Sequence, residues 1–509
     1  MKSTFCFVSA VVVAFAVPLC AAEQPLVDTD SGSIVGESLS DGMAVFRCFS
    51  YAVASIGELR WKEPQPAANW DGALDCTAFG NVAPQSNRLA QMTGETLPET
   101  SEDCLYLNVW TTNLDGDEPL PVMVWIHGGG WTGGYSQQGL YDGVNFSKRG
   151  VVFVSINYRL GPFGFFAHNL LSEESPNRSS GHYGLLDQVE ALKWAQRNIE
   201  AFGGDPHNVT IFGESAGGSS VYALCASPLA KGLFHRAIAQ SPWVVPTNFV
   251  PLRSTGDAVE SREAIGARTA ETWLGGAPVT LEALRAIPAN ELFARVGERY
   301  EPACAIDGWF MPDFPERIFA AGEQSDVPLI AGTNRDEGTM FAMMFTYKNS
   351  AEYEAVLREE YGSRADAVLA AYPASDAMTM RQSITQHITD AWFIRPTRAM
   401  VRGWESVSSN AYMYHFTQIG QIPMLKAHHA AEIAYVFNNL DTEEKASLEL
   451  ADAMIRYWVE FASTGNPNTE GLPEWPAYSA VPDTHLVFDG SGISTGSGLR
   501  ARECDLLDL

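Results

Sequence analysis

Continuous apolar runs of strand length alternate along this chain with segments in which apolar residues recur at helical spacing. The runs PVMVWIHGG (121–129), VVFVSINYR (151–159) and VTIF (209–212) are of the first kind, which is typical of parallel strands buried on both faces. Between the second and third runs, YGLLDQVEALKWAQRNIEAFGG (183–204) has helical periodicity and ends at a glycine pair, a common stop signal. The pattern therefore predicts strand, helix, strand in succession.

The same alternation continues in the second half of the chain. VPLIAGTN (327–334) and AYMYHF (411–416) predict two more strands, so the sequence favours one large α/β domain with a mostly parallel central sheet flanked by helices. Segments 249–299 and 350–390 are predicted to be helical cap insertions over the carboxyl edge of the sheet, where open α/β sheets bind their ligands. Neither an internal repeat nor a long Pro/Gly/Ser linker divides the chain.

The N-terminus predicts export. Lys2 is followed by an apolar run over 5–17 and by small residues, so residues 1–22 are interpreted as a cleaved signal peptide and 23–509 as the mature domain, secreted or periplasmic. Lipid attachment at Cys20 is disfavoured because a leucine precedes it. The apolar run is too short for a membrane span and no later segment supplies one, so stable membrane insertion is not expected.

Charge and cysteine usage narrow the class of protein further. The formal net charge is −28 and no Lys/Arg cluster is present, which argues against a nucleic-acid partner. Six cysteines remain after removal of the signal peptide, none in a CxxC pair or at zinc spacing with histidine. Neither a metal nor another cofactor is expected.

The segment GESAGG contains the pattern G-x-S-x-G immediately after a predicted strand. A helix is predicted to begin near Ala216, and a sharp strand-to-helix turn would expose the hydroxyl of Ser215 as a nucleophile. Taken alone, the pattern also fits a glycine-rich turn with an incidental serine. HGGG (127–130) at the end of another strand supplies a second feature, because side-chain-free residues let backbone N–H groups approach an oxyanion. Gly129, Gly130 and Ala216 are the expected donors.

With these motifs, the chain resembles the type B carboxylesterase and lipase family, which includes the cholinesterases, within the α/β-hydrolase fold. The resemblance implies a serine esterase that cleaves carboxylic esters of small molecules through an acyl-enzyme on Ser215. The matching segments extend over most of the chain: LRWKEPQP (59–66), SEDCLYLNVW (101–110), NYRLGPFGF (157–165), NIEAFGGDPHNVTIFGESAGG (198–218), GTNRDEGT (332–339) and FASTGNPN (461–468).

The resemblance also assigns the acid and the base. The family's glutamate in an N-x-D-E-G turn corresponds to Glu337, with the neighbouring Asp336 as the alternative. The family's histidine lies three residues before an acidic residue that opens an apolar-aromatic run, which selects His429. The adjacent His428 remains the alternative because AHHAAE departs from the usual family pattern.

Other matching residues have structural roles in the family. Arg60 with Glu102, and Arg159 with Asp187, resemble ion pairs that tie loops to the core. Trp131 follows the glycine run and either borders the substrate cleft or belongs to the core.

Two further assignments follow from the resemblance. Glu214 precedes the nucleophile and lies either in the pocket or in a purely structural site. A disulfide between Cys76 and Cys104 is expected, with Cys48 as another partner, while Cys225 is expected to be a buried free thiol.

The loop RLAQMTGETLPET (88–100) contains no aromatic residue, so the cation-binding tryptophan of cholinesterases is missing and choline esters are not expected. Two alternatives to a carboxylesterase stay open: a lipase acting on triacylglycerols, and a non-catalytic binding ectodomain of the same fold. Oligomeric state, the acyl and alcohol groups of the ester, and amide or carbamate cleavage are not predicted.

Overall fold

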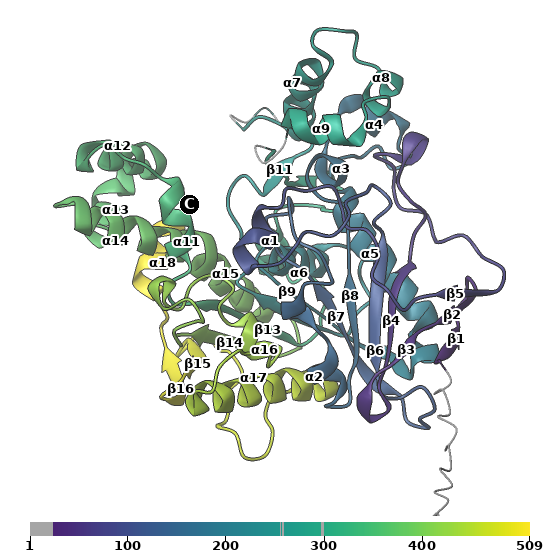
Figure 1. Cartoon of the computed structure of the whole chain (residues 1–509). Helices are drawn as coiled ribbons and strands as arrows, with labels where there is room; N and C mark the ends of the chain where they lie inside the picture. The colour runs from purple at the N-terminus through teal and green to yellow at the C-terminus, as the bar shows by residue number, and fades with distance from the viewer. Residues whose placement is uncertain (1–23, 255, 257–258, 297–299, 509) are drawn as a thin grey trace, which may run out of the picture.

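The computed structural model describes residues 24–254, 256, 259–296 and 300–508; the predicted signal peptide lies outside these residues. Within them, a twisted sheet of eleven strands has the order β16-β15-β14-β13-β10-β9-β7-β8-β6-β4-β3 (Figure 1). From β15 to β8 all neighbours are parallel, and antiparallel strands extend both edges. The strands are β3 (Glu37–Ser38), β4 (Ala44–Ser50), β6 (Tyr106–Thr111), β7 (Leu120–Ile126), β8 (Val152–Ile156), β9 (Gly204–Glu214), β10 (Arg236–Gln240), β13 (Leu329–Asn334), β14 (Ala411–Phe416), β15 (Thr484–Asp489) and β16 (Gly492–Ser497).

Helices cover both faces of this sheet, which explains why its central strands are apolar throughout. In β7, Val124 belongs to one hydrophobic core and the next residue, Trp125, to the other, because successive side chains of a strand point to opposite faces. The predicted fold class is confirmed. One face carries α3 (Gly161–Phe165), α5 (Tyr183–Asn198), α6 (Ala216–Ala226), α10 (Pro315–Ala321) and α15 (Arg395–Gly403); the other carries α2 (Val144–Ser147), α16 (Ile433–Val436) and α17 (Lys445–Thr464).

Two groups of helices form the cap insertions, and Figure 1 draws both at the upper end of the sheet. The first is α7 (Arg262–Leu274), α8 (Leu281–Arg285) and α9 (Ala289–Val296); the second is α12 (Ser350–Tyr361), α13 (Ala365–Ala371) and α14 (Ala377–Ile388). Side-chain caps begin several of them: Ser261 accepts from the Ala264 N–H and Asp376 from the Met378 N–H, which satisfies otherwise unpaired donors.

The first cap segment was predicted to be helical from residue 249, and this is wrong for its start. Its opening residues form β11 (Phe249–Pro251), which pairs in parallel with β12 (Cys304–Ile306). Phe249 and Val250 are buried, and pairing with a strand more than fifty residues later satisfies their backbone groups. A local periodicity cannot report a partner at that distance.

The remaining elements are short. A three-stranded sheet of β1 (Leu26–Asp28), β2 (Ser33–Val35) and β5 (Ala73–Asp75) lies beside the main sheet. The other helices are α1 (Arg88–Thr93), α4 (Asn169–Glu174), α11 (Gly338–Phe341) and α18 (Ala501–Leu507), and a π-helix, η8, covers Thr389–Ile394. The 3₁₀ turns are η1 (Ser40–Gly42), η2 (Gly57–Leu59), η3 (Gly139–Tyr141), η4 (Ile199–Phe202), η6 (Ala342–Met344), η7 (Gly362–Arg364), η9 (Trp404–Ser406) and η10 (Pro423–Leu425). In the described part of the chain, no helix combines the length and apolarity needed to cross a membrane.

Both predicted ion pairs are present; the Arg159–Asp187 pair is fully buried and the Arg60–Glu102 pair largely so. Arg60 donates to the two carboxylate oxygens of Glu102 at 2.6 Å each, and Arg159 donates to Asp187 at 2.8 and 2.6 Å. Two parallel hydrogen bonds of this kind fix the relative orientation of the guanidinium and the carboxylate as well as pairing their charges. These pairs anchor the segments that follow η2 and β8.

The predicted disulfide between Cys76 and Cys104 is wrong for this structure. All six described cysteines are free thiols, and both of these are completely buried. Burial raises the pKa of Cys76 to about 12 and that of Cys104 further still, which favours the neutral thiol at both positions. Cys225 is the buried free thiol that the sequence predicted.

Candidate active site

Ser215 lies at the turn between β9 and α6. Its φ of 57° and ψ of −122° are values that a residue with a side chain adopts only when its surroundings hold it there. The Ser215 N–H donates to the Gln240 carbonyl oxygen at 3.0 Å, and the Ser215 carbonyl oxygen accepts from the Ser219 N–H at 2.8 Å. The turn therefore presents this serine at the carboxyl end of β9, in the predicted strand-to-helix context.

Two glycines allow β7 to approach this turn closely. A Cβ atom on Gly217 would lie 2.0 Å from the Ile126 carbonyl oxygen, and one on Gly213 would lie 2.5 Å from the same atom. Both distances are shorter than van der Waals contact allows. The pattern G-x-S-x-G thus has a steric reason at each glycine.

The glycine run after β7 lies against the same serine. A Cβ atom on Gly128 would be 3.1 Å from the Ser215 Cβ, and Gly129 and Gly130 have φ values of 106° and 64°, which glycine adopts without strain. The Ala216 N–H lies in the first turn of α6, where an amide has no acceptor within its own helix. The three predicted oxyanion donors are therefore on two segments that meet at the nucleophile.

Glu337 and His429 are brought into contact although they are far apart in the sequence. Glu337 Oε2 lies 2.6 Å from His429 Nδ1. The other carboxylate oxygen accepts from the Ser241 hydroxyl at 2.6 Å and from the Asn334 N–H at 2.7 Å. Because Glu337 is fully buried and all these bonds are short, the imidazole is held in one orientation.

The alternative residues make other contacts. Asp336 accepts from Arg335 at 2.9 Å and from the Ala427 N–H at 3.3 Å, which joins two loops. The His428 ring is bonded through Nδ1 to the carbonyl oxygen of His429 at 2.6 Å. Neither alternative takes part in a carboxylate–imidazole pair.

The second ring nitrogen of His429 faces a carboxylate, not the serine. His429 Nε2 lies 3.2 Å from Glu214 Oε1, within ion-pair distance, but neither atom makes a hydrogen bond with the residues that the structure describes. The predicted contact between Ser215 and His429 is therefore not made here. Catalytic hydrogen bonds are often long without substrate and tighten in the complex, and Ser215 directly follows Glu214 in the turn.

Two carboxylates thus flank one buried imidazole. Burial by itself lowers the pKa of His429, but Glu214 and Glu337 together outweigh that effect and raise it to about 9. Burial also raises the pKa of Glu214 well above its ordinary value, and the nearby charge of Glu432 adds to the rise. Glu214 is therefore a buried carboxyl group in contact with the candidate base.

A third buried carboxyl group supports the site. Glu432 accepts from the side chains of Asn334 at 2.5 Å and Gln240 at 3.2 Å, and Gln240 in turn accepts from the indole of Trp458. Burial, helped by the charge of Glu337, raises the pKa of Glu432 to about 7. In the sequence, Glu432 served only to locate His429; its partners Asn334 and Gln240 come from two distant segments and leave no local pattern.

Trp131 belongs to the core. It is fully buried, its indole N–H donates to the Ser220 hydroxyl at 3.0 Å, and its ring stacks on Phe165 with centroids 5.1 Å apart. It therefore supports the glycine run from behind and does not border a cleft.

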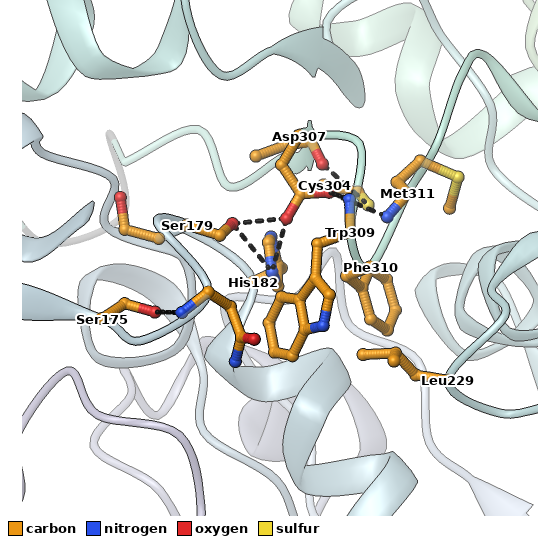
Figure 2. Close-up of polar contacts among 12 residues, drawn as sticks. Ser175, Ser179, His182, Leu229, Cys304, Asp307, Trp309, Phe310 and Met311 are labelled. Atoms are coloured by element: carbon orange, nitrogen blue, oxygen red, sulfur yellow. Dashed lines mark hydrogen bonds and ion pairs between the residues drawn. The ribbon is translucent and has the colours of Figure 1, made fainter. Parts of the chain in front are cut away.

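A second serine, histidine and aspartate set lies elsewhere and has the wrong geometry for a nucleophile (Figure 2). The Ser179 hydroxyl donates to Asp307, and both groups approach the same nitrogen, Nε2 of His182, at 3.5 Å. In a catalytic triad the acid and the serine contact opposite nitrogens of the imidazole. Asp307 also accepts from the N–H groups of Trp309 and Met311, so this set fixes a loop. Among the described residues no group of three or more His, Cys, Asp or Glu could hold a metal ion.

Comparison with known proteins gives a consistent result. The model of the "Carboxylesterase family" matches residues 23–507. The chain is 34% identical over 484 residues to the fumonisin B1 esterase of Sphingopyxis macrogoltabida, which covers 92% of this chain and 87% of that protein. It is 36% identical over 488 residues to the para-nitrobenzyl esterase of Bacillus subtilis (strain 168), which covers 91% and 94%.

Solved structures show the same similarity. A PNB esterase structure superimposes with a TM-score of 0.82 at 34% sequence identity, covering 96% of this chain and 100% of that one. A thermophilic PNB esterase also superimposes with a TM-score of 0.82 at 34% identity, covering 95% and 100%.

Proposed function

The chain belongs to the carboxylesterase family and is a hydrolase of carboxylic esters; from this premise we propose that Ser215, His429 and Glu337 are its catalytic residues. His429 Nε2 accepts the proton of the Ser215 hydroxyl as its oxygen attacks the ester carbonyl carbon. Glu337 fixes the ring through Nδ1 and stabilises the imidazolium that forms.

The tetrahedral oxyanion is held by the N–H groups of Gly129, Gly130 and Ala216. Collapse of this intermediate releases the alcohol, which takes its proton from His429, and leaves the acyl group on Ser215. Water then attacks the acyl-enzyme with His429 again as the base, and the carboxylic acid is released.

The observation that carries this proposal is the short, buried contact between His429 and Glu337 beside a strained serine turn. The ring also touches Glu214, the residue before Ser215, so the imidazole lies at that turn. The mechanism requires that the Ser215 hydroxyl take the place of Glu214 Oε1 beside His429 Nε2.

Replacement of Ser215 by alanine tests the proposal. Because no other group can carry the acyl intermediate, we expect kcat for a simple ester to fall at least about 10⁴-fold, with little change in the thermal unfolding temperature. A fluorophosphonate probe should label the wild-type protein and not S215A.

The second serine set provides the matched control. Ser179→Ala removes a buried serine hydroxyl that also lies beside a histidine and a carboxylate, yet we expect it to keep fluorophosphonate labelling and ester hydrolysis. If S215A were labelled as strongly as the wild-type protein, or if S179A alone lost labelling, the assignment of the nucleophile would be wrong.

We further propose that the enzyme is exported and acts on small, water-soluble esters. The support for export is the N-terminal pattern alone, and its test is N-terminal sequencing of the secreted or periplasmic protein, expected to begin at Glu23. The support for small esters is the similarity to the para-nitrobenzyl esterase of Bacillus subtilis. A 4-nitrophenyl ester series of increasing acyl length, with a triolein emulsion beside it, should show highest kcat/KM at short or medium chains; faster turnover of the emulsion would favour a lipase.

A further inference from the structure

Four aromatic side chains that are only partly buried gather on one side of the candidate active site. They come from three segments: Trp243 follows β10, Phe341 ends α11, Phe345 follows η6, and Trp392 lies in the π-helix η8. The Trp392 ring centroid is 6.5 Å from that of Trp243, 5.6 Å from Phe341 and 5.8 Å from Phe345. These four residues are called the aromatic wall below.

The aromatic wall reaches the nucleophile at one end. The Trp243 N–H donates to the Ser215 carbonyl oxygen at 3.5 Å, and the Trp243 carbonyl oxygen accepts from the Ser219 hydroxyl at 2.7 Å. A Cβ atom on Gly130 would lie 4.0 Å from Trp243 Cζ3. The indole therefore borders the glycine that we assign to the oxyanion.

At its other end the aromatic wall reaches the base. The Phe341 ring centroid lies 5.1 Å from that of His429 at an interplanar angle of 64°. Phe393, which is fully buried, packs behind both, 5.6 Å from Phe341 and 4.7 Å from His429. An ester bound at Ser215 consequently has this wall along one flank, from the oxyanion site to the imidazole.

The backbone holds the two tryptophans in fixed relation. The Val244 N–H, one residue after Trp243, donates to the Trp392 carbonyl oxygen at 3.2 Å. Trp392 lies within η8, and π-helical turns insert a residue that redirects the following side chains and are frequent at functional sites. The wall is therefore preorganised, and a ring that binds to it meets surfaces already in place.

We propose that Trp243 and Trp392 select esters that carry a neutral aromatic ring, in the acyl or in the alcohol group. Aromatic rings prefer offset and edge-to-face arrangements with other rings, and such pairs stabilise beyond the apolar area they bury. The wall presents aromatic rings from three segments, so an aromatic ring of the ester is the matching ligand. This inference rests on the proposed function, because it needs Ser215 as the reacting residue.

Two matched ester pairs test the selection. Ethyl phenylacetate and ethyl cyclohexylacetate differ in the acyl ring, while benzyl acetate and cyclohexylmethyl acetate differ in the alcohol ring; within each pair only aromaticity changes appreciably. We expect the wild-type kcat/KM to favour the aromatic member of at least one pair about three- to tenfold. The pair that shows this ratio identifies the side of the ester that the wall contacts.

Variants then connect the ratio to the wall. Trp392→Leu and Trp243→Leu should each bring the ratio toward one, whereas Trp392→Phe and Trp243→Phe should keep part of it. Trp70→Leu, which replaces a half-buried tryptophan beside β2, should keep the wild-type ratio. Because each ratio compares two esters on one protein, a general loss of activity cancels. If a leucine variant does not fold, a partial fall in the matching phenylalanine variant supports the proposal and an unchanged ratio overturns it.

Equal kcat/KM within both pairs for the wild-type protein, or a ratio that survives both leucine variants, would overturn the selection while leaving the proposed function intact. A preference for an acetylcholine substrate over its neutral 3,3-dimethylbutyl isostere, lost in the leucine variants, would assign the wall to a cation and also overturn it. A wild-type protein that cleaves none of these esters would contradict the proposed function itself.

Discussion

At the scale of single residues, the two carboxylates around His429 determine how the rate should depend on pH. A general base must be neutral, so activity rises as pH increases through the pKa of His429, which is about 9. Glu214 is a main cause of that high value. Glu214→Gln removes its charge and lowers the pKa, so the acid limb of the kcat/KM profile should move toward neutral pH by about one pH unit.

The measurement is a kcat/KM profile of a soluble ester from pH 6 to 10 for E214Q and the wild-type protein. Glu200→Gln, an exposed residue in η4, is the matched control and should leave the profile in place. A profile of E214Q that stays fixed or moves to higher pH would show that Glu214 does not act on His429 in the way described.

Ala430, next to His429, has an unfavourable backbone conformation. Its φ is 68°, a left-handed value that costs a residue with a Cβ atom about 1–2 kcal/mol. Ala430→Gly removes this strain but gives the unfolded chain more freedom, so we expect a net stabilisation of about 0.5–1 kcal/mol. The measurement is the thermal unfolding temperature. Ala434→Gly, in helix α16, should instead lower it, by about 1 kcal/mol of stability.

At the scale of elements, the contact between β7 and the turn into α6 depends on glycine. Gly217→Ala would place a Cβ atom 2.0 Å from the Ile126 carbonyl oxygen, and this oxygen belongs to a central strand that cannot yield. We expect a loss of about 3 kcal/mol or more, seen as a lower unfolding temperature or as insoluble protein.

Gly232→Ala controls for the substitution itself. Gly232 has a φ of 81° and open space around its Cα, so the change should cost only about 1 kcal/mol. Similar unfolding temperatures for the two variants would contradict the steric explanation.

The elements also show where local pattern suffices. The predicted strands over 151–159, 327–334 and 411–416 contain β8, β13 and β14, and that over 121–129 overlaps β7, because each is short, apolar on both faces and bounded by turn residues. β11 was missed because its pairing partner is β12, which follows three helices later. The helical segment was predicted to stop at the glycine pair 203–204; α5 itself ends at Asn198, and the 3₁₀ turn η4 continues the segment to Phe202. Gly203 then ends it because glycine adopts the left-handed conformation, here with a φ of 76°.

At the scale of the whole molecule, buried neutral histidines should make the fold sensitive to acid. Burial lowers the pKa of His127 and His387 to about 4 and that of His415 to about 3, from an ordinary 6.5. Between these values the unfolded chain binds protons that the folded chain does not, so stability falls as pH decreases from about 6.5 toward 4. Each group contributes roughly 1.4 kcal/mol per pH unit at most. Glu432, whose pKa is raised from 4.5 to about 7, has the opposite effect.

Unfolding temperatures between pH 7.5 and 4.5 test this dependence. His387→Gln keeps a partner for the hydroxyl of Tyr361 and should make the decline with acid shallower. His207→Gln, which changes an exposed histidine, should leave the slope as in the wild-type protein. A slope that is unchanged in H387Q would remove His387 from this explanation.

The sequence by itself determined the fold class, the turn at Ser215 and the glycine run, because each depends on residues that are neighbours in the chain. Strand length, glycine placement and a strand-to-helix boundary are local properties, and a local pattern reports them. The family resemblance added Glu337 and His429 by position.

Only the tertiary structure decided which groups touch. It brings together segments separated by dozens to hundreds of residues in three places: the contacts of His429 with Glu337 and Glu214, the bonds of Glu432, and the aromatic wall. It also shows that Cys76 and Cys104 are free thiols. Such contacts depend on how the sheet orders its strands and on how the cap helices close over its edge. The physical reason is that packing and burial act between surfaces. The amino-acid pattern shows which face of a segment is apolar or polar, but not which distant segment packs against that face.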